Sequence, residues 1–259
     1  MDITSWTQDM EHWVEQVAAY QRDAAQRQSL DIRTKGQDTD YVTDVDIQSE
    51  AMLISFIQKR YPDHSIYSEE KGRLEQGSDY LWVIDPIDGT TNFIHGFPMS
   101  SISIALQYQG STVVGMVCAP ALNMTFYAAR GRGAYLNGKR IHVSGRSDLT
   151  SSLLATGFPN DRTRSKLNLP YFSRMSSLVS GIRRTGSAAL DLCFVAAACL
   201  DGFWEFDLNS WDMCAGALMI EEAGGEILQL EVGGHNLLLC SNSQLLESLR
   251  TALLSEDDI

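Results

Sequence analysis

Two aspartates, Asp85 and Asp88, stand three residues apart where an apolar run ends in the stretch LWVIDPIDGTTNF. Pro86 lies between them, and because a proline fixes one backbone angle, both carboxylates can be held on the same side of a rigid turn. Mg²⁺ is a hard cation that takes carboxylate and carbonyl oxygens, so two close aspartates are suited to bind it. The same residues also favour an ordinary acidic turn, because Asp, Pro and Gly are common turn formers.

Three other acidic stretches could supply further carboxylates. Glu69 and Glu70 follow a short apolar stretch in YSEEKG, where the alternative is a solvated pair before a glycine turn. Asp46 in YVTDVD is also explained as a negative charge in the first turn of a helix, and Asp212 in NSWDMC as a helix N-cap. Each stretch by itself is therefore satisfied by an explanation that involves no metal.

The residues after the first two aspartates are suited to an oxyanion. Gly89 lets the backbone approach a ligand closely, and the stretch GTTNF that it begins can offer the free N–H groups of a helix start. The turn follows an apolar strand, and open α/β sheets form their ligand crevices at the carboxyl ends of strands. We therefore expect a ligand site at this end of the strand.

Two helices and a polar connection are predicted before this turn. Apolar residues recur at helical spacing over about residues 4–27, which predicts an amphipathic helix whose apolar side is core or interface. A second helix is expected to begin at Thr43 or Asp44 and to end before Pro62. The polar segment between the two helices holds Lys35.

The remainder of the chain shows two patterns. Short apolar or alternating runs between residues 100 and 144 predict an antiparallel sheet with a tight hairpin at Asn137–Lys139. After about residue 151 the pattern alternates, with strands at 152–157, 181–186, 202–208, 226–230 and 236–241, and helices at about 161–179, 187–199 and 212–225 and a last one to about Leu254. We expect one compact α/β unit over residues 1–259, with halves at about 1–150 and 151–259.

The composition limits the functions open to this protein. Its 259 residues carry a formal net charge of −13, which argues against nucleic acid or an anionic membrane as a partner, because both attract clustered Lys and Arg. The five cysteines are scattered, which is typical of reduced thiols rather than of a disulfide framework. The sequence has no apolar run long enough for a membrane span and no signal-like N-terminus, so we expect a cytoplasmic protein.

Taken together, the acidic stretches match a known pattern. WVIDPIDGTTNFIH resembles the first signature of the inositol monophosphatase family of Mg²⁺-dependent phosphatases, and WDMCAGALMIEEAGG resembles the second, with SEEKG upstream of the first. The two signatures occur in the order and separation usual in the family. The resemblance implies a five-layered α-β-α-β-α sandwich of the sugar-phosphatase type.

The resemblance also implies a set of metal ligands. By residue type and place, the family's ligands fall on Glu69, Asp85, the backbone carbonyl of Ile87, Asp88 and Asp212. The first Mg²⁺ would be held by Glu69, Asp85 and the Ile87 carbonyl. The second would be held by Asp85, Asp88 and Asp212, and a third, weaker ion would lie near Glu69. Two or three Mg²⁺ ions are therefore expected.

The resemblance assigns roles around these metals as well. Thr90 and Asp46 resemble the family's pair that orients the nucleophilic water, and with Glu69 they are the expected catalytic residues. The amides of Gly89 and Thr90 would cradle the phosphate. Lys35 matches a lysine in a mobile N-terminal loop of the family, and an exposed loop lysine is the alternative.

The substrate end is implied by two further positions. Glu205 falls where relatives that bind inositol carry an acid that contacts ring hydroxyls, and Ala188 falls where a backbone amide does so. A cross-strand surface charge is the alternative for Glu205. Arg183 or Arg184 in RRTGS could contact a second anionic group. His95 matches no ligand of the family and is expected to be structural.

The resemblance thus implies a phosphoric monoester hydrolase whose partner is a small phosphorylated polyol, with inositol 1-phosphate as first candidate. Fructose 1,6-bisphosphate, histidinol phosphate, NADP and adenosine 3′,5′-bisphosphate are alternatives within the family. A non-catalytic binding protein of the transcription machinery, as some bacterial relatives are, is an alternative of another class. A Ca²⁺-stabilised structural protein is a third, although no D-x-D-x-D-G loop occurs. The resemblance further implies inhibition by Li⁺ and a homodimer.

Overall fold

An eight-stranded sheet forms the larger part of the computed structural model, which describes residues 2–27, 29–34, 41–159 and 166–254. Its strands are β3 (Ser65–Ser68), β4 (Gly72–Leu74), β5 (Tyr80–Asp88), β6 (Ser101–Tyr108), β7 (Ser111–Ala119), β8 (Met124–Ala129), β9 (Gly133–Leu136) and β10 (Lys139–Ile141), in the order β10-β9-β8-β7-β6-β5-β3-β4. From β5 to β10 every pairing is antiparallel, which confirms the sheet expected between residues 100 and 144. Asn137 and Gly138 both have positive φ, as the predicted hairpin requires.

Two long helices, α1 (Ile3–Ala24) and α2 (Asp44–Arg60), pack against the larger sheet. The apolar side of α1 buries Trp6, Met10 and Trp13 in this layer, so it is core. Thr43 is the N-cap of α2, and its side chain accepts from the backbone N–H of Val45. A small hairpin of β1 (Ile32–Thr34) and β2 (Tyr41–Thr43) precedes α2.

A five-stranded sheet forms the rest of the framework. Its strands are β11 (Leu153–Thr156), β12 (Gly181–Arg183), β13 (Gly202–Phe206), β14 (Gly225–Val232) and β15 (His235–Asn242), in the order β12-β11-β13-β15-β14. The helices of this region are α4 (Leu169–Ser176), α5 (Ala188–Ala196), α6 (Ser210–Glu222) and α7 (Leu246–Leu253). A 3₁₀ turn at Leu149–Ser151 precedes β11, so the expected boundary near residue 150 falls between the two sheets.

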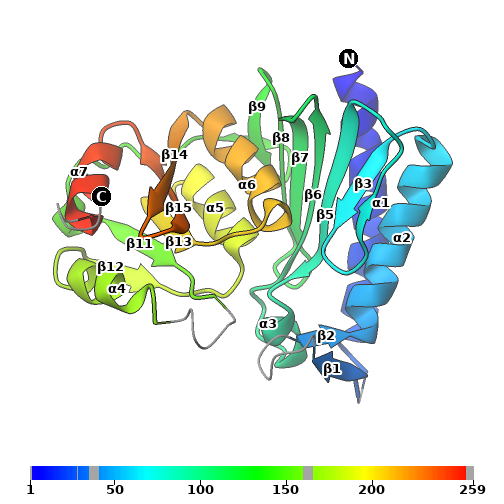
Figure 1. Cartoon of the computed structure of the whole chain (residues 1–259), viewed down its shortest axis with the longest axis horizontal. Helices are drawn as coiled ribbons and strands as arrows, with labels where there is room; N and C mark the ends of the chain where they lie inside the picture. Colours follow the sequence, from blue (N-terminus) through cyan, green and yellow to red (C-terminus); the bar gives the residue numbers. More distant parts are fainter. Residues whose placement is uncertain (1, 28, 35–40, 160–165, 255–259) are drawn as a thin grey trace.

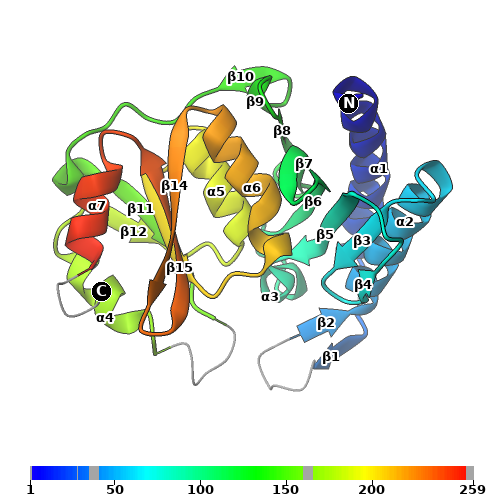
Figure 2. The same ribbon diagram turned by 45° about the horizontal axis from the view of Figure 1, so that its top comes forward.

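The layers stack in the order α-β-α-β-α, which confirms the predicted sandwich. Figures 1 and 2 show α1 and α2 outside the larger sheet, α5 and α6 between the sheets, and α4 and α7 outside the smaller sheet. A Cβ on Gly115 of β7 would lie 2.9 Å from the Cα of Ala215 in α6. A Cβ on Gly216 would lie 2.6 Å from the Cβ of Leu192 in α5. Glycines therefore let the central helices pack closely on the larger sheet and on each other.

One helix is shorter than predicted. The helix expected at about 161–179 is α4, which spans only Leu169–Ser176, and residues 160–165 lie outside the described part of the chain. Asn168 precedes α4, where its buried side chain accepts from Trp204 Nε1 (2.8 Å) and donates to the Gly157 carbonyl (2.6 Å). These bonds hold Asn168 at the helix boundary, and Pro170 in the first turn is typical of a helix start.

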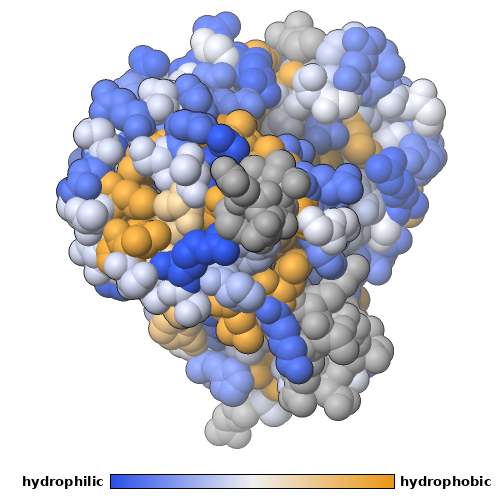
Figure 3. All heavy atoms as spheres, turned by 60° about the vertical axis from the view of Figure 1, so that its left-hand side comes forward, coloured by the Kyte–Doolittle hydropathy of each residue, from blue (hydrophilic) through white to orange (hydrophobic). Residues whose placement is uncertain are grey.

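The distribution of surface residues and the state of the five cysteines match what the composition led us to expect. On the face that Figure 3 shows, hydrophobic residues lie in small groups among hydrophilic ones. Cys118, Cys193, Cys214 and Cys240 are buried, Cys199 is exposed, and all five are free thiols. None of the described helices has the length and apolar character that a membrane span requires.

Candidate active site

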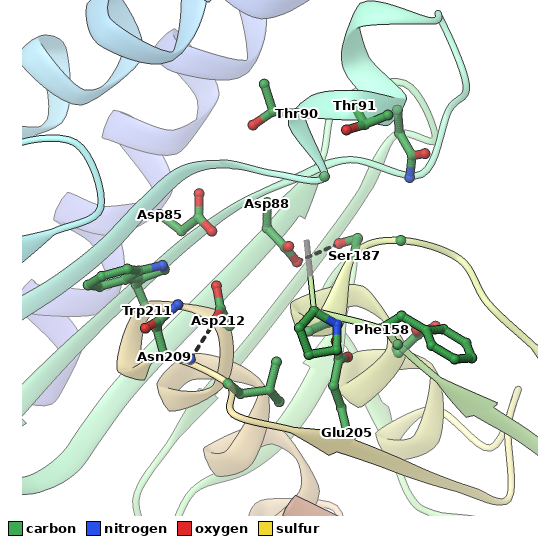
Figure 4. A pocket seen from close by; sticks show the side chains of 18 of the residues that line it. Asp85, Asp88, Thr90, Thr91, Phe158, Ser187, Glu205, Asn209, Trp211 and Asp212 are labelled. Atoms are coloured by element: carbon green, nitrogen blue, oxygen red, sulfur yellow. Dashed lines mark hydrogen bonds between the residues drawn. The ribbon is translucent and has the colours of Figure 1, made fainter. Parts of the chain in front are cut away.

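A cavity of about 480 Å³ lies at the carboxyl end of β5. Segments far apart in the chain line it: the end of β5, the short helix α3 (Thr90–Ile94), the first residues of α5 and α6, and part of β13. Figure 4 shows the side chains of Asp85, Asp88 and Asp212 directed toward one another across this space. The predicted crevice at the end of the strand is therefore present.

Three carboxylates form the centre of the cavity. One oxygen each of Asp85, Asp88 and Asp212 lies within 4.8 Å of the others, close enough to share a metal ion. Glu69 lines the same cavity. It directly follows β3, which runs parallel to β5 with Ser68 opposite Ile84, so the chain places Glu69 and Asp85 side by side.

Burial and mutual repulsion disfavour the charged forms of the three aspartates. Burial raises the pKa of Asp85 well above its ordinary value, and the charge of Glu69 raises it further. Burial likewise raises the pKa of Asp212 well above its ordinary range, and that of Asp88 to about 6. Among the described residues that line the cavity, Arg184 is the only cationic side chain. Oxygen-rich, charge-deficient surroundings of this kind fit a hard divalent cation.

Asp212 stands at the start of α6, but it is not the N-cap that its sequence context suggested. Asn209 is the N-cap, and Asp212 is the third residue of the helix. The backbone N–H of Asn209 donates to Asp212 Oδ2 (2.7 Å), as in a capping box. One carboxylate oxygen is therefore held by the helix end while the side chain is directed into the cavity.

Asp46 is held in the same way at the start of α2. Its Oδ2 accepts from the backbone N–H of Thr43 (2.9 Å), which completes a second capping box. Its Oδ1 accepts from the Thr90 hydroxyl (3.0 Å), so the predicted pair is in contact. Asp46 is fully buried, and burial raises the pKa of its carboxyl group.

The turn between Asp88 and Thr90 requires glycine. Gly89 has φ 92°, and a Cβ there would lie 2.9 Å from the Met99 carbonyl. The first backbone N–H groups of α3, which follows, have no partner within the helix. Ile87 lines the cavity, and its carbonyl oxygen lies 3.1 Å from the Thr90 hydroxyl, as the alternative to Asp46 as acceptor of the single hydroxyl hydrogen.

The expected substrate contacts line the opposite side of the cavity. Ala188 is the first residue of α5, and Glu205 lies on β13. Glu205 is half-buried, so the alternative of a surface charge is wrong. A Cβ on Gly157 would lie 2.1 Å from the Glu205 carboxylate oxygens, so the carboxylate packs directly on this glycine. Burial and the charge of Asp191 raise the pKa of Glu205 well above its ordinary value.

The other candidate residues differ in whether they line the cavity. Arg183 and Arg184 are both exposed, but of the two only Arg184 lines the cavity, and Arg183 at the end of β12 donates to the Ile182 carbonyl. His95 is exposed at the end of α3 and does not line the cavity. Lys35 lies outside the residues that the structure describes.

Three supporting residues escaped the sequence analysis. Ser187 donates its hydroxyl hydrogen to Asp88 Oδ2 (2.6 Å). Gln21 of α1 donates to the Pro86 carbonyl (2.8 Å), and Glu50 of α2 accepts from the N–H of Glu70 (2.9 Å). Gln21 and Glu50 are polar residues on the buried sides of their helices. A polar residue at such a position indicates a buried hydrogen bond, and this signal could have been found in the sequence.

The sequence and the fold both have close counterparts. Residues 4–256 match the sequence profile described as "Inositol monophosphatase family". A protein of Pseudomonas aeruginosa named "Nus factor SuhB" is 46% identical over 226 residues, which cover 83% of this chain and 83% of that protein. An "Inositol-1-monophosphatase" of Synechocystis sp. is 42% identical over 228 residues, 86% of this chain and 79% of that protein. The crystal structure of the extragenic suppressor protein suhB from Bartonella henselae matches with a TM-score of 0.90 and 35% identity, over 97% of this chain and 99% of that one.

Proposed function

The chain belongs to the inositol monophosphatase family and is a phosphoric monoester hydrolase, and on this premise we propose that it hydrolyses the phosphate ester of a small polyol with Mg²⁺. Inositol 1-phosphate is the first candidate substrate. The observation that carries the proposal is the contact of Thr90 with Asp46 in the cavity that also gathers the three aspartates. A set of carboxylates beside a positioned hydroxyl is what metal-assisted attack of water on a phosphate needs.

Two groups of ligands would hold the metal. Glu69, Asp85 and the Ile87 carbonyl would hold the first ion, and Asp85, Asp88 and Asp212, whose oxygens lie close together, would hold the second. Two or three Mg²⁺ ions are proposed. When bound, Mg²⁺ lowers the pKa of water and stabilises charge on phosphate and ester oxygens. The protein's own part is to hold these oxygens on rigid strand and helix ends.

Thr90 would orient the attacking water. Its single hydroxyl hydrogen can be donated to Asp46 Oδ1, which leaves the oxygen lone pairs free to accept from a water. Asp46 cannot turn away, because Thr43 binds its second oxygen. The pair therefore fixes the direction in which a water donates its proton. Gly89 and Thr90 would bind the phosphate oxygens through their N–H groups.

The cavity has a phosphate end and a polyol end. The phosphate end is formed by the aspartate cluster with Gly89 and Thr90, and the polyol end by Ala188, Glu205 and Phe158. A carboxylate at the polyol end accepts hydrogen bonds from ring hydroxyls and repels a second phosphate. Arg184 is the one described cationic side chain that could offset this repulsion. We therefore favour a monophosphate of an uncharged polyol over the bisphosphate alternatives.

A phosphate-release assay with a panel of substrates tests this function. The panel contains inositol 1-phosphate, fructose 1,6-bisphosphate, histidinol phosphate, NADP and adenosine 3′,5′-bisphosphate, each with and without Mg²⁺. We expect the highest kcat/KM with inositol 1-phosphate and no turnover in EDTA. Faster hydrolysis of another member would replace the proposed substrate, and turnover in EDTA would overturn the proposed metal chemistry.

A second candidate function rests on the name of one relative. The Pseudomonas aeruginosa protein, at 46% identity, is called a Nus factor, and we propose a non-catalytic binding role in transcription as the alternative. Asp85→Asn separates the two functions, because it removes a proposed metal ligand inside the cavity. A deletion phenotype that Asp85→Asn fails to rescue supports catalysis, whereas full rescue by the inactive variant supports the binding role.

Two expectations from the family, Li⁺ inhibition and a homodimer, and one from the composition, the cytoplasmic location, stay predictions. Inhibition by Li⁺ is tested by titrating LiCl into the phosphate assay, and a homodimer by size-exclusion chromatography with light scattering. The cytoplasmic location is tested by fractionating cells that express the protein with a C-terminal tag. Loss of activity at millimolar Li⁺, a mass of two chains and recovery in the cytosolic fraction are the expected results.

A further inference from the structure

The loop between β12 and α5, residues 184–187, joins the two ends of the cavity. It follows a strand of the smaller sheet and leads directly to Ala188 at the polyol end. Its neighbours across the cavity, however, are β5 and α3 of the other half of the chain. How this loop is fixed decides how the two ends of the cavity are spaced.

Asn92, in the middle of α3, binds this loop from the phosphate end. Its Nδ2 donates to the Thr185 carbonyl at 2.8 Å and to the Met99 carbonyl at 2.6 Å. A side-chain amide has two N–H hydrogens, so both are used, each by a different segment. One side chain thus ties α3 to the loop before α5 and to the segment before β6.

Asp88 binds the same loop at a second point. Its Oδ2 accepts from the Ser187 hydroxyl (2.6 Å) and from the Ala189 N–H (2.8 Å). Ser187 also lies 3.2 Å from the Ser101 hydroxyl. This second attachment involves a proposed metal ligand, whereas the attachment by Asn92 does not.

The space between α3 and the loop is filled by the Asn92 amide. A Cβ on Gly186 would lie 2.9 Å from Asn92 Nδ2. A Cβ on Gly89 would lie 3.0 Å from the Gly186 carbonyl. Two glycines therefore face each other across this contact, so the loop can approach α3 only as closely as the Asn92 amide allows.

We propose that Asn92 is a positioning residue that sets the distance between the phosphate end and the polyol end of the cavity. It acts through the Thr185 carbonyl, and thereby through the start of α5 that carries Ala188. The inference rests on the proposed function, because only a substrate that spans both ends needs this spacing. A small shift of a bound substrate relative to the reacting groups can lower the rate considerably.

Two substrates separate positioning from general damage. Inositol 1-phosphate would occupy both ends of the cavity, whereas p-nitrophenyl phosphate has no polyol hydroxyls. With Mg²⁺ present, we expect N92A to lower kcat/KM for inositol 1-phosphate about tenfold or more, largely through KM, and to change that for p-nitrophenyl phosphate less than about threefold. Equal losses for both substrates, or no loss for either, would overturn the proposal.

Hydrogen–deuterium exchange gives a second readout that needs neither metal nor substrate. We expect exchange of peptides covering residues 184–190 to accelerate about tenfold in N92A, because one attachment of the loop is lost. Unchanged exchange would overturn the role of Asn92 even if the protein is a polyol phosphatase. Faster exchange in a protein that hydrolyses no polyol phosphate would overturn the proposed function but leave Asn92 as the attachment of this loop.

Two further variants control for folding. N92D keeps the shape of the side chain but replaces Nδ2 by a carboxylate oxygen that faces both carbonyl oxygens, so we expect at least the effect of N92A on both readouts. N137A removes another asparagine that bridges two backbone groups, those of Asn123 and Thr125, none of which lines the cavity. N137A should lower the melting temperature without changing the ratio of the two kcat/KM values, and a changed ratio would overturn the specificity of the Asn92 effect.

Discussion

The phosphate end and the polyol end of the cavity are held by different kinds of contact. At the phosphate end, Asp46 and Asp212 each belong to a capping box, and Asp88 accepts from Ser187. At the polyol end, Glu205 rests on Gly157, and among the described residues none donates a hydrogen bond to its carboxylate. Within the part of the chain that the structure describes, the carboxylates of the phosphate end are thus held by the protein itself, whereas the Glu205 carboxylate keeps hydrogen-bonding capacity for a substrate.

This difference suggests that the phosphate end carries out the reaction and that the polyol end selects the substrate. Carboxylates whose second oxygen is held by a helix end keep their direction during the reaction, which lowers the cost of reorganisation. A carboxylate without a partner in a half-buried site gains most when a ligand supplies the hydrogen bond. Substitutions at the phosphate end should therefore lower kcat for every substrate, and those at the polyol end should act on polyol substrates alone.

Asp212→Asn should have the largest effect. Removal of one of the three clustered carboxylates weakens metal binding and the stabilisation of charge, and we expect kcat to fall on the order of 10³-fold for both inositol 1-phosphate and p-nitrophenyl phosphate. Calorimetric titration with Mg²⁺ checks the cause. Glu247→Gln, on the outer helix α7, is the matched control and should behave as wild type. Normal Mg²⁺ affinity in Asp212→Asn would contradict the assignment.

Thr90→Val should have the next largest effect. Valine keeps the shape but cannot accept the proton of a water, so we expect kcat to fall about 100-fold with little change in KM. Steady-state kinetics with both substrates measure the loss. Thr90→Ser retains the hydroxyl and should recover most of the activity. Equal losses in Thr90→Val and Thr90→Ser would show that packing, rather than the hydroxyl, matters here.

Glu205→Gln should have a smaller and selective effect. We expect KM for inositol 1-phosphate to rise about tenfold, because an oxygen acceptor for ring hydroxyls is replaced by an amide N–H donor, while kcat/KM for p-nitrophenyl phosphate stays the same. Initial rates across a substrate series give both values. A loss for both substrates would mean that Glu205 supports the phosphate end, and the comparison between the ends would fail.

The smallest effect is expected in the stability of the metal-free protein. The pKa of Asp88 is raised to about 6 in the folded chain, from 3.8 for an ordinary aspartate, so the folded state binds this proton more tightly. The resulting stability is present below about pH 4 and is lost as pH rises through about 6. In EDTA, the melting temperature should therefore fall by a few degrees, about 2–4 °C per kcal/mol, between pH 5 and pH 8.

Mg²⁺ should reverse this trend, because it binds the ionised carboxylates. Differential scanning fluorimetry at both pH values, with EDTA or Mg²⁺, measures the effect, and Mg²⁺ should raise the melting temperature more at pH 8 than at pH 5. Asp88→Asn serves as the comparison, since it removes this titration. A metal-free melting temperature that rises between pH 5 and pH 8 would contradict unbalanced carboxylates at the phosphate end.

The phosphate end was largely predictable from the sequence, because its residues follow local rules. Asp85 and Asp88 end an apolar strand, and Asp46 and Asp212 stand in the first turns of helices whose starts are readable. The N-cap assigned to Asp212 was wrong by three residues, because Asn209 caps the helix instead. That error does not change the direction of the carboxylate, since a capping box also turns it back toward the helix end.

The contacts between residues far apart in the chain could not be predicted in this way. Gln21 reaches Pro86 across 65 residues, and Asn92 reaches Thr185 across 93. No spacing rule relates such positions, because the packing of the finished layers brings them together. The length of α4 was also missed, since Asn168 is used in bonds to Trp204 and Gly157 that only the tertiary structure shows.

The close approach at Gly115 has a consequence for the metal site. Ala215 lies about one turn of α6 after Asp212 and contacts Gly115 of β7. Because Gly115 has no side chain, α6 lies directly against the backbone of the sheet at this point. Asp85 belongs to that sheet and Asp212 to that helix. A glycine outside the cavity therefore limits how far apart the two carboxylates lie. A larger residue at position 115 would push α6 away from the sheet, and with it Asp212 away from Asp85.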